Sequence, residues 1–101
     1  MYDSSNMKKL SQLGAKASEA WKGFVAFDKA ALADGVIPKK YKELMAIAVA
    51  LTTQCPYCID IHADAARKAG CTDEELAEAS FVAAALRAGA AVTHATHLMK
   101  D

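Results

Sequence analysis

Apolar residues in this chain recur every three or four positions, which is the spacing of one face of an α-helix. No stretch alternates apolar and polar residues as a half-buried β-strand does. Alanine, the strongest helix former, dominates the composition, and β-branched residues are scattered. The pattern therefore predicts an all-α fold, a helical bundle of four segments.

The first predicted helix covers residues 5–33 and ends at Asp34 and Gly35. Its apolar face consists of Leu10, Leu13, Ala17, Ala20, Trp21, Phe24 and Phe27. The second begins near Pro38, because proline suits a first helical turn, and stops near Gln54. Leu44, Ile47, Ala48 and Leu51 form its apolar stripe.

Pro56 opens the third predicted helix, and Gly70 closes it. Thr72 and Glu75 have the spacing of a capping box, which places the start of a fourth helix there. We expect this last helix to loosen at Gly89 and to end at His97 or Met99.

Length and charge narrow the class of protein. A chain of 101 residues suits one domain, residues 1–101, and its 12 basic and 12 acidic side chains leave no footprint for nucleic acid or an anionic membrane. We find no apolar run long enough to span a bilayer and no secretory signal at the N-terminus. Three clustered cysteines are too few for a secreted disulfide scaffold, so we expect a cytoplasmic protein. The first and last helices look too apolar for one chain to cover, which predicts a homo-oligomer.

The candidate chemistry lies in Cys55-Pro56-Tyr57-Cys58 and in His62 and Glu43. Two thiols separated by two residues can close a disulfide, and a thiol at a helix start is favoured as thiolate by unpaired backbone N–H groups. His62 shares the helix face of Cys58 four residues away and can exchange a proton with it. This combination indicates a redox site.

Glu43 cannot reach the cysteines along its own helix, because twelve helical residues rise about 18 Å. If the second and third helices form an antiparallel hairpin, Glu43 faces His62 rather than the sulfurs. It would then orient the imidazole directly, act through a water, or reach a neighbouring subunit. Taken alone, a glutamate near a helix start is usually a solvated surface residue.

Two other interpretations use the same cysteines. Cys55, Cys58 and His62 could ligate structural zinc with Cys71, His94 or His97 as a fourth ligand, although zinc sites more often join irregular loops. Cys-Pro-Tyr-Cys also looks like a glutaredoxin motif. A glutaredoxin places that motif after a β-strand and needs a downstream cis-proline, which this chain lacks, so we reject that fold.

Glu43, Cys55, Cys58 and His62, in this spacing, resemble the signature of the alkylhydroperoxidase AhpD-like branch of the carboxymuconolactone decarboxylase family. The resemblance covers about residues 36–88. It implies an all-α fold that assembles as a homotrimer or homohexamer, and thiol-dependent reduction of hydroperoxides without a cofactor or metal. The decarboxylase branch generally lacks the cysteine pair.

The resemblance also implies roles. Cys58 would attack the peroxide, Cys55 would supply a proton and then form the disulfide, and His62 and Glu43 would relay protons. The electron donor would be a dithiol or a thioredoxin-like protein. Some members carry histidine where this chain has Tyr57. The alternative is a redox sensor or interaction protein whose disulfide controls assembly without peroxide turnover.

The remaining candidates carry weaker signals. Cys71 follows a helix end and is read as a packing residue or spare thiol. His94 and His97 share a helix face and suit a metal or a subunit contact equally. Core or interface positions are assigned to Trp21, Phe24, Phe27 and Phe81.

Overall fold

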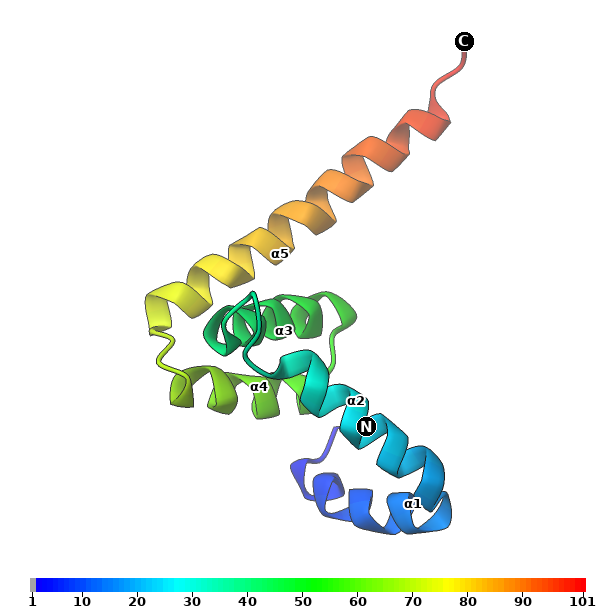
Figure 1. The fold of residues 1–101 in the computed structure, drawn as a ribbon. Coiled ribbons are helices and arrows are strands. Elements are labelled where there is room, and N and C mark those ends of the chain that lie inside the picture. The colour runs from blue at the N-terminus through cyan, green and yellow to red at the C-terminus, as the bar shows by residue number, and fades with distance from the viewer. Residues whose placement is uncertain (1) are drawn as a thin grey trace.

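The structure, a computed structural model, describes residues 2–101 and contains helices and no strands among them (Figure 1). In chain order the elements are η1 (Ser4–Lys9), α1 (Leu10–Lys16), α2 (Ser18–Leu32), α3 (Lys39–Thr53), α4 (Pro56–Lys68), α5 (Asp73–His94) and η2 (Ala95–Leu98). The predicted all-α class is confirmed.

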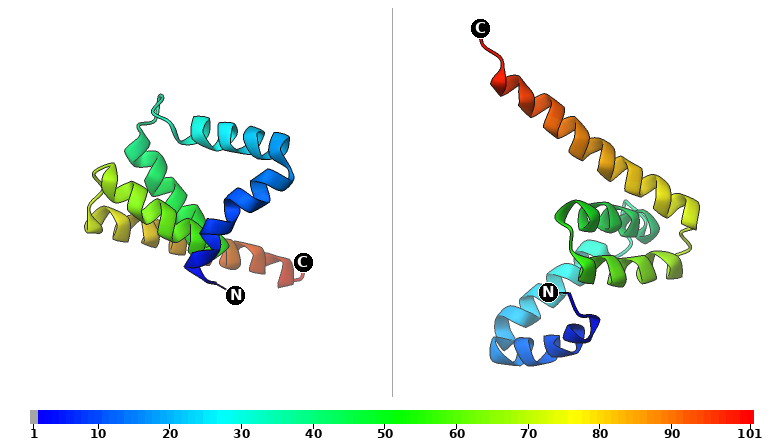
Figure 2. Two further views of the ribbon diagram at one scale, coloured as in Figure 1. Left: turned by 90° about the horizontal axis from the view of Figure 1, so that it is seen from below. Right: turned by 180° about the vertical axis from the view of Figure 1, so that it is seen from behind.

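The core lies where α3 packs between α4 and α5. Figures 1 and 2 show α3 and α4 as an antiparallel hairpin, with the first half of α5 lying across α3. The buried apolar residues come from these elements and the loop between α4 and α5: Ile47, Ala50, Ala66, Cys71 and Ala83. Four of the five are small, so these helices approach one another closely.

The helix ends of this hairpin lie where the sequence predicts them. Gln54 ends α3 in the left-handed region, with φ 56°, and Pro56 occupies the first turn of α4. Gly70 follows α4 with φ +94°, a conformation that a side chain disfavours. Thr72 and Glu75 form the predicted reciprocal capping box of α5.

The single helix predicted over residues 5–33 is wrong. The chain instead forms η1, α1 and α2, with a break at Ala17, whose φ of −144° and ψ of 62° are not helical. The break folds Trp21 back onto Gly14, so closely that a Cβ on Gly14 would lie 2.6 Å from the indole ring. Tertiary packing of one tryptophan on one glycine therefore overrides a continuous helical period.

The loosening predicted at Gly89 is also absent. Helix α5 continues through Gly89 to His94, and the last turn, η2, becomes a 3-10 helix. Glycine in a helix costs about 1 kcal/mol relative to alanine, which a helix with a satisfied capping box tolerates.

The second half of α5 extends away from the other helices, giving extents of 55 × 32 × 29 Å (Figures 1 and 2). Phe81 and Leu86 on this helix are 75% and 69% exposed. Phe24 and Phe27 of α2 are also exposed, so these aromatics are not core residues within one chain.

One segment, Asp73–Leu98, is long and apolar enough to cross a membrane by length and composition. The sequence analysis expected no such run. The difference arises because the segment is rich in alanine, which raises mean hydropathy without forming a continuous run of large apolar side chains.

Candidate active site

The two motif cysteines lie at the N-terminus of α4, both as free thiols. Cys55 is the N-cap residue, and its sulfur accepts a hydrogen bond from the Cys58 backbone N–H at 3.4 Å. The two Sγ atoms are 2.8 Å apart. The predicted placement of the pair at a helix start is confirmed, and the sulfurs need little movement to form a disulfide.

The two thiols differ in acidity. The hydrogen bond with the Cys58 thiol, aided by backbone N–H groups, lowers the pKa of Cys55 below its ordinary value. The same contact raises the pKa of Cys58, with burial and the nearby Asp28 carboxylate adding to it. The pKa of Cys55 is thus the lower of the two, which favours Cys55 over Cys58 as the site of the pair's first negative charge.

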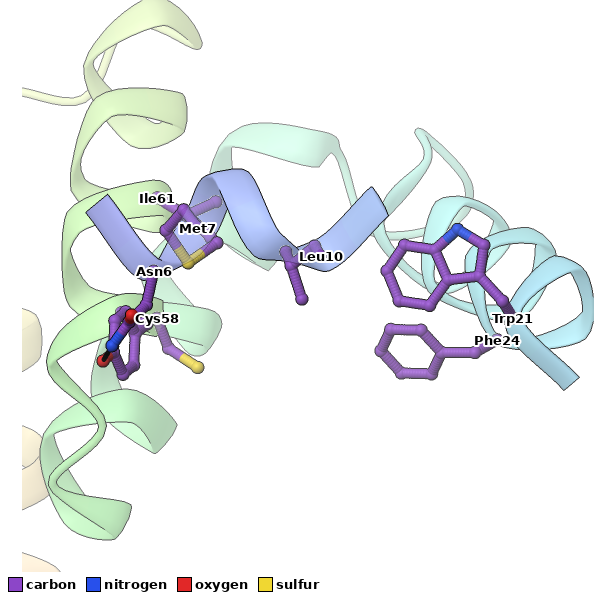
Figure 3. A pocket seen from close by; sticks show the side chains of 8 residues that line it. Asn6, Met7, Leu10, Trp21, Phe24, Cys58 and Ile61 are labelled. Carbon is purple, nitrogen blue, oxygen red and sulfur yellow. Dashed lines mark hydrogen bonds between the residues drawn. The ribbon is translucent and has the colours of Figure 1, made fainter. Parts of the chain in front are cut away.

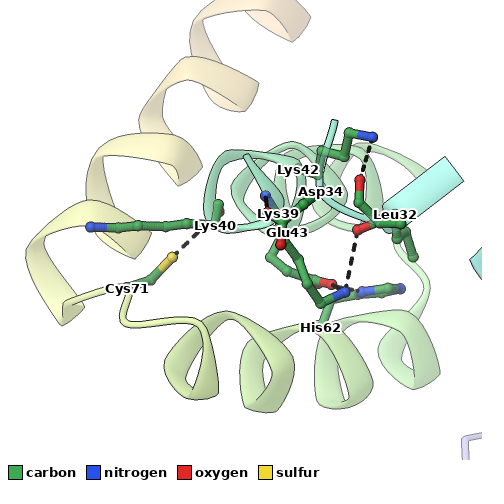
Figure 4. Close-up of polar contacts among 9 residues, drawn as sticks. Leu32, Asp34, Lys39, Lys40, Lys42, Glu43, His62 and Cys71 are labelled. Atoms are coloured by element: carbon green, nitrogen blue, oxygen red, sulfur yellow. Dashed lines mark hydrogen bonds and ion pairs between the residues drawn. The ribbon is translucent and has the colours of Figure 1, made fainter. Parts of the chain in front are cut away.

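Glu43 and His62 meet across the α3–α4 hairpin (Figure 4). Glu43 is 1% exposed, and its Oε2 lies 2.8 Å from Nδ1 of His62. Since a carboxylate only accepts, the imidazole donates its Nδ1–H and retains Nε2 for proton exchange. The structure contains the antiparallel hairpin, and Glu43 contacts the His62 imidazole directly within one chain. The sequence had left this direct contact as one of three options. The surface position expected for Glu43 taken alone is wrong.

Lys39 is a further member of this cluster, which the sequence analysis missed. Its Nζ lies 3.2 Å from Oε1 of Glu43 and 3.3 Å from the carbonyl oxygen of Leu32 (Figure 4). The buried carboxylate is thus shared between an ammonium group and an imidazole. The i, i+4 spacing of Lys39 and Glu43 was a signal, but it is commonest on solvated helix faces.

Cys58 and His62 are near neighbours in space without a direct bond. Both line two cavities, one among α2, α3 and α4 and one among α1, α2 and α4, with Asp28 of α2 on the wall of each. Within residues 2–101, no hydrogen bond joins His62 to either sulfur. Proton exchange between Cys58 and Nε2 would therefore pass through a water or a bound molecule in these cavities.

A third cavity, of about 400 Å³, also has Cys58 on its wall and adjoins one of these two (Figure 3). Its remaining walls come from η1, α1, α2 and α4, and are formed by Asn6, Met7, Leu10, Trp21, Phe24, Tyr57 and Ile61. The polar groups among these are the Asn6 amide, the Tyr57 hydroxyl and the indole N–H of Trp21. Cys58 is thus the sulfur that faces an apolar space of the size that small-molecule ligands fill.

Cys71, His94 and His97 lie outside this cluster. Cys71 is buried, its sulfur is 3.6 Å from the Lys40 carbonyl oxygen, and burial raises the pKa of its thiol, which agrees with a packing role (Figure 4). The rings of His94 and His97, on the exposed end of the chain, are tilted by 49° to each other with centroids 5.0 Å apart. In the described part of the chain, no three His, Cys, Asp or Glu residues are placed to hold a metal ion.

Comparison with known proteins assigns the chain to a family. Residues 18–101 match the carboxymuconolactone decarboxylase family. The chain belongs to this family. Its members include decarboxylases and peroxidases, so membership by itself does not choose between those reactions.

Individual relatives agree with this assignment. An uncharacterized protein from the cox locus of Paracoccus denitrificans is 46% identical over 92 residues, covering 91% of this chain and 80% of that protein. A carboxymuconolactone decarboxylase family protein from Legionella pneumophila, solved in its apo form, is 34% identical with a TM-score of 0.78, covering 91% of this chain and 82% of that one. A protein from Methanobacterium thermoautotrophicum is also 34% identical, with a TM-score of 0.81 over 85% of this chain and 97% of that one.

Proposed function

We propose that this family member is a thiol-dependent peroxidase of the alkylhydroperoxidase type, which reduces hydroperoxides through a dithiol–disulfide cycle. The observation that carries the proposal is the pair of free thiols 2.8 Å apart at a helix start, with Cys58 facing a cavity. A decarboxylase needs no such pair. Glu43 and His62 supply a proton relay beside it.

The reaction transfers two electrons from the dithiol to the peroxide. The Cys58 thiolate attacks one peroxide oxygen, the O–O bond breaks, and the alkoxide leaves as an alcohol after taking a proton. Cys58 then carries a sulfenic acid. Cys55 attacks that sulfur, an S–S bond forms, and the hydroxyl leaves as water after a second protonation. A dithiol or thioredoxin-like donor reduces the disulfide to complete the cycle.

The position of the negative charge on the cysteine pair limits how Cys58 can attack the peroxide. The negative charge of the resting pair favours Cys55, because the contact between the two sulfurs lowers the pKa of Cys55 and raises the pKa of Cys58. Attack by Cys58 therefore requires its proton to cross to Cys55 over 2.8 Å, or to reach His62 through the shared cavities. Cys55 is in this way the proton acceptor before it is the resolving thiol.

The proposal is tested by mass spectrometry of the reduced protein after one equivalent of cumene hydroperoxide. We expect a loss of two hydrogen atoms and a linked peptide pair containing Cys55 and Cys58. Cys55→Ser should gain one oxygen at Cys58 and form no internal disulfide, and Cys58→Ser should not consume peroxide. Cys71→Ala, which leaves the pair intact, is the control. Turnover retained in Cys58→Ser and lost in Cys55→Ser would reverse the two roles.

The alternative is a redox sensor or interaction protein that uses the same disulfide. Such a protein would be oxidised once by peroxide and would not turn over. Steady-state peroxide consumption with a supplied dithiol separates the two, because a sensor stops after one equivalent per pair.

We further propose that the protein works in the cytoplasm as a homotrimer or homohexamer, without nucleic acid or membrane partners. A compact monomer of 10.7 kDa exposes about 5,500 Å², whereas this chain exposes 7746 Å². The excess exceeds the roughly 800 Å² that one partner contributes to a standard interface. Helix α5 fits a second copy better than a bilayer, since its first half packs on α3 and Arg87 bonds the Thr52 carbonyl.

A further inference from the structure

The N-terminal segment, residues 2–10, builds one wall of the 400 Å³ cavity in front of Cys58. It contributes Met7 and Leu10, which face Trp21 and Phe24 of α2 across the cavity (Figure 3). The match to the family begins at residue 18, so this wall lies outside the matched region. This wall is therefore a place where the chain can differ from other family members, and such a difference would change which substrates reach the two thiols.

The same segment is fastened to the cysteine motif itself. The Tyr57 hydroxyl, between the two cysteines in sequence, accepts hydrogen bonds from Asn6 Nδ2 at 2.9 Å and from the Asp3 backbone N–H at 3.2 Å. The Tyr2 ring packs edge-on against the Tyr57 ring with centroids 4.8 Å apart, and its hydroxyl bonds Asp60. These contacts to α4 position Met7 and Leu10 beside the Cys58 sulfur.

The walls of this cavity are apolar apart from the indole N–H of Trp21 and the polar groups of Asn6 and Tyr57, whose side chains bond each other. Hydrogen peroxide gains nothing from such walls, because it has no apolar surface to bury. A hydroperoxide with an aryl or alkyl substituent can place its peroxide group at Cys58 and its substituent between Leu10 and the Trp21–Phe24 pair. Each methylene equivalent buried there favours it by about fourfold.

We propose that residues 2–10 form a selectivity wall that makes the Cys58 site prefer hydroperoxides with a bulky apolar substituent over hydrogen peroxide. The proposed selectivity rests on the proposed peroxidase function, whereas the cavity as a binding site for an apolar group does not depend on that function. Tyr57 and Asn6 are the positioning residues of the wall, and Leu10 is its contact with the substituent.

Selectivity is measured as the ratio of rate constants for single-turnover oxidation of the reduced protein by cumene hydroperoxide and by hydrogen peroxide. Leu10→Ala should lower this ratio about fifteenfold, as expected for two methylene equivalents lost from the contact. Asn6→Ala should lower it too, by freeing the segment from Tyr57. Leu13→Ala is the matched control: the same substitution on α1, at a residue that lines a cavity without Cys58. If the ratio is unchanged in Leu10→Ala, or falls equally in Leu13→Ala, the proposal that residues 2–10 set the selectivity is refuted.

A second measurement does not depend on turnover. Trp21 is the single tryptophan of the chain and lines the cavity, so its fluorescence reports occupation. Titration with 2-phenyl-2-propanol, the alcohol formed from cumene hydroperoxide, should give a saturable change that Leu10→Ala weakens and Leu13→Ala retains. Binding without peroxide turnover would remove the proposed function and keep the cavity as an apolar site. Peroxide turnover without selectivity or alcohol binding would support the peroxidase function and refute the selectivity of the wall.

Discussion

At the scale of single residues, the geometry of the two sulfurs decides which one is ionised first. Cys55 accepts a hydrogen bond from the Cys58 backbone N–H, and its contact with the Cys58 sulfur lowers its pKa, whereas the pKa of Cys58, the more buried of the two, is raised. The thiol proposed to attack peroxide is thus not the thiol that is more acidic at rest. Cys55 is the more acidic thiol, whereas Cys58 is the thiol that lines the cavity.

This division predicts opposite responses to removal of each partner. Cys58→Ala should raise the pKa of Cys55, because the largest cause of its depression is lost. Cys55→Ala should lower the pKa of Cys58, because the contact that raises it most is lost while burial remains. The pH dependence of iodoacetamide alkylation, followed peptide by peptide, measures both. With Cys71→Ala as control, alkylation of Cys58 before Cys55 in the wild-type protein near neutral pH would contradict the assignment.

Lys39 gives a second prediction at this scale. Lys39→Met retains an apolar stem but leaves buried Glu43, among the described residues, with the His62 imidazole as its remaining side-chain partner. Hydrogen bonds to charged groups contribute about 1.5–3 kcal/mol, and we expect a loss near 1 kcal/mol because Lys39 is partly exposed. Urea unfolding measures this loss, and Lys39→Arg should recover part of it.

The control for Lys39 is Lys22→Met, which breaks an exposed ion pair with Glu19 on α2. Its unfolding free energy should change by no more than about 0.5 kcal/mol. Equal losses in the two variants would mean that Lys39 acts only as a surface charge.

Spacing predicted that Glu43 faces His62 if their helices form a hairpin, but it did not choose a direct contact over a water or a neighbouring subunit, and the Lys39 contact was not predicted. Spacing along an antiparallel hairpin places residues 43 and 62 at one level, and the observed 2.8 Å contact agrees. Lys39 faces Glu43 by helical period, but the sequence does not say that this face is buried. Burial depends on how α2 and its end at Leu32 approach α3, which is a tertiary outcome.

At the scale of elements, local signals located the helix ends on either side of the motif and failed in the first third of the chain. A left-handed Gln54, Pro56, Gly70 and the Thr72 capping box act within a few residues, so sequence alone reveals them. The break at Ala17 accompanies the packing of Trp21 on Gly14, which the helical period does not predict. Periodicity continued across the break, because α1 and α2 both present apolar faces.

Gly14 therefore predicts a sharp test of the break. A Cβ at this position would lie 2.6 Å from the Trp21 ring, so Gly14→Ala should displace the indole and destabilise the protein by about 1–3 kcal/mol, as overpacking does. Gly23→Ala on α2 meets nothing within 4 Å and should instead stabilise by about 0.5–1 kcal/mol through helix propensity. Urea unfolding followed by Trp21 fluorescence distinguishes them. Equal effects of the two substitutions would mean that the Gly14 contact does not set the break.

At the scale of the whole molecule, one chain is too extended to be the complete functional unit that we propose. Its radius of gyration is 17.0 Å, against about 13 Å for a compact domain of this length. The sequence indicated this through apolar first and last helices, but it could not say that α5 leaves the core after its first half. That direction follows from α5 packing on α3 near Ala83 and extending straight through Gly89.

The exposed half of α5 carries the last prediction. If a second copy covers it, wild-type protein should sediment as a trimer or hexamer at micromolar concentration. Leu86→Glu places a charge on a 69% exposed apolar side chain and should shift the population to smaller species, because an unpaired carboxylate resists burial in an interface. Gln12→Glu adds the same charge at an exposed polar position of α1 and should leave the mass of the assembly unchanged.

A monomeric wild-type protein, or a Leu86→Glu variant whose assembly has the wild-type mass, would refute self-association through this face. Co-sedimentation of the wild-type protein with phospholipid vesicles, lost in Leu86→Glu, would identify a membrane as its occupant instead.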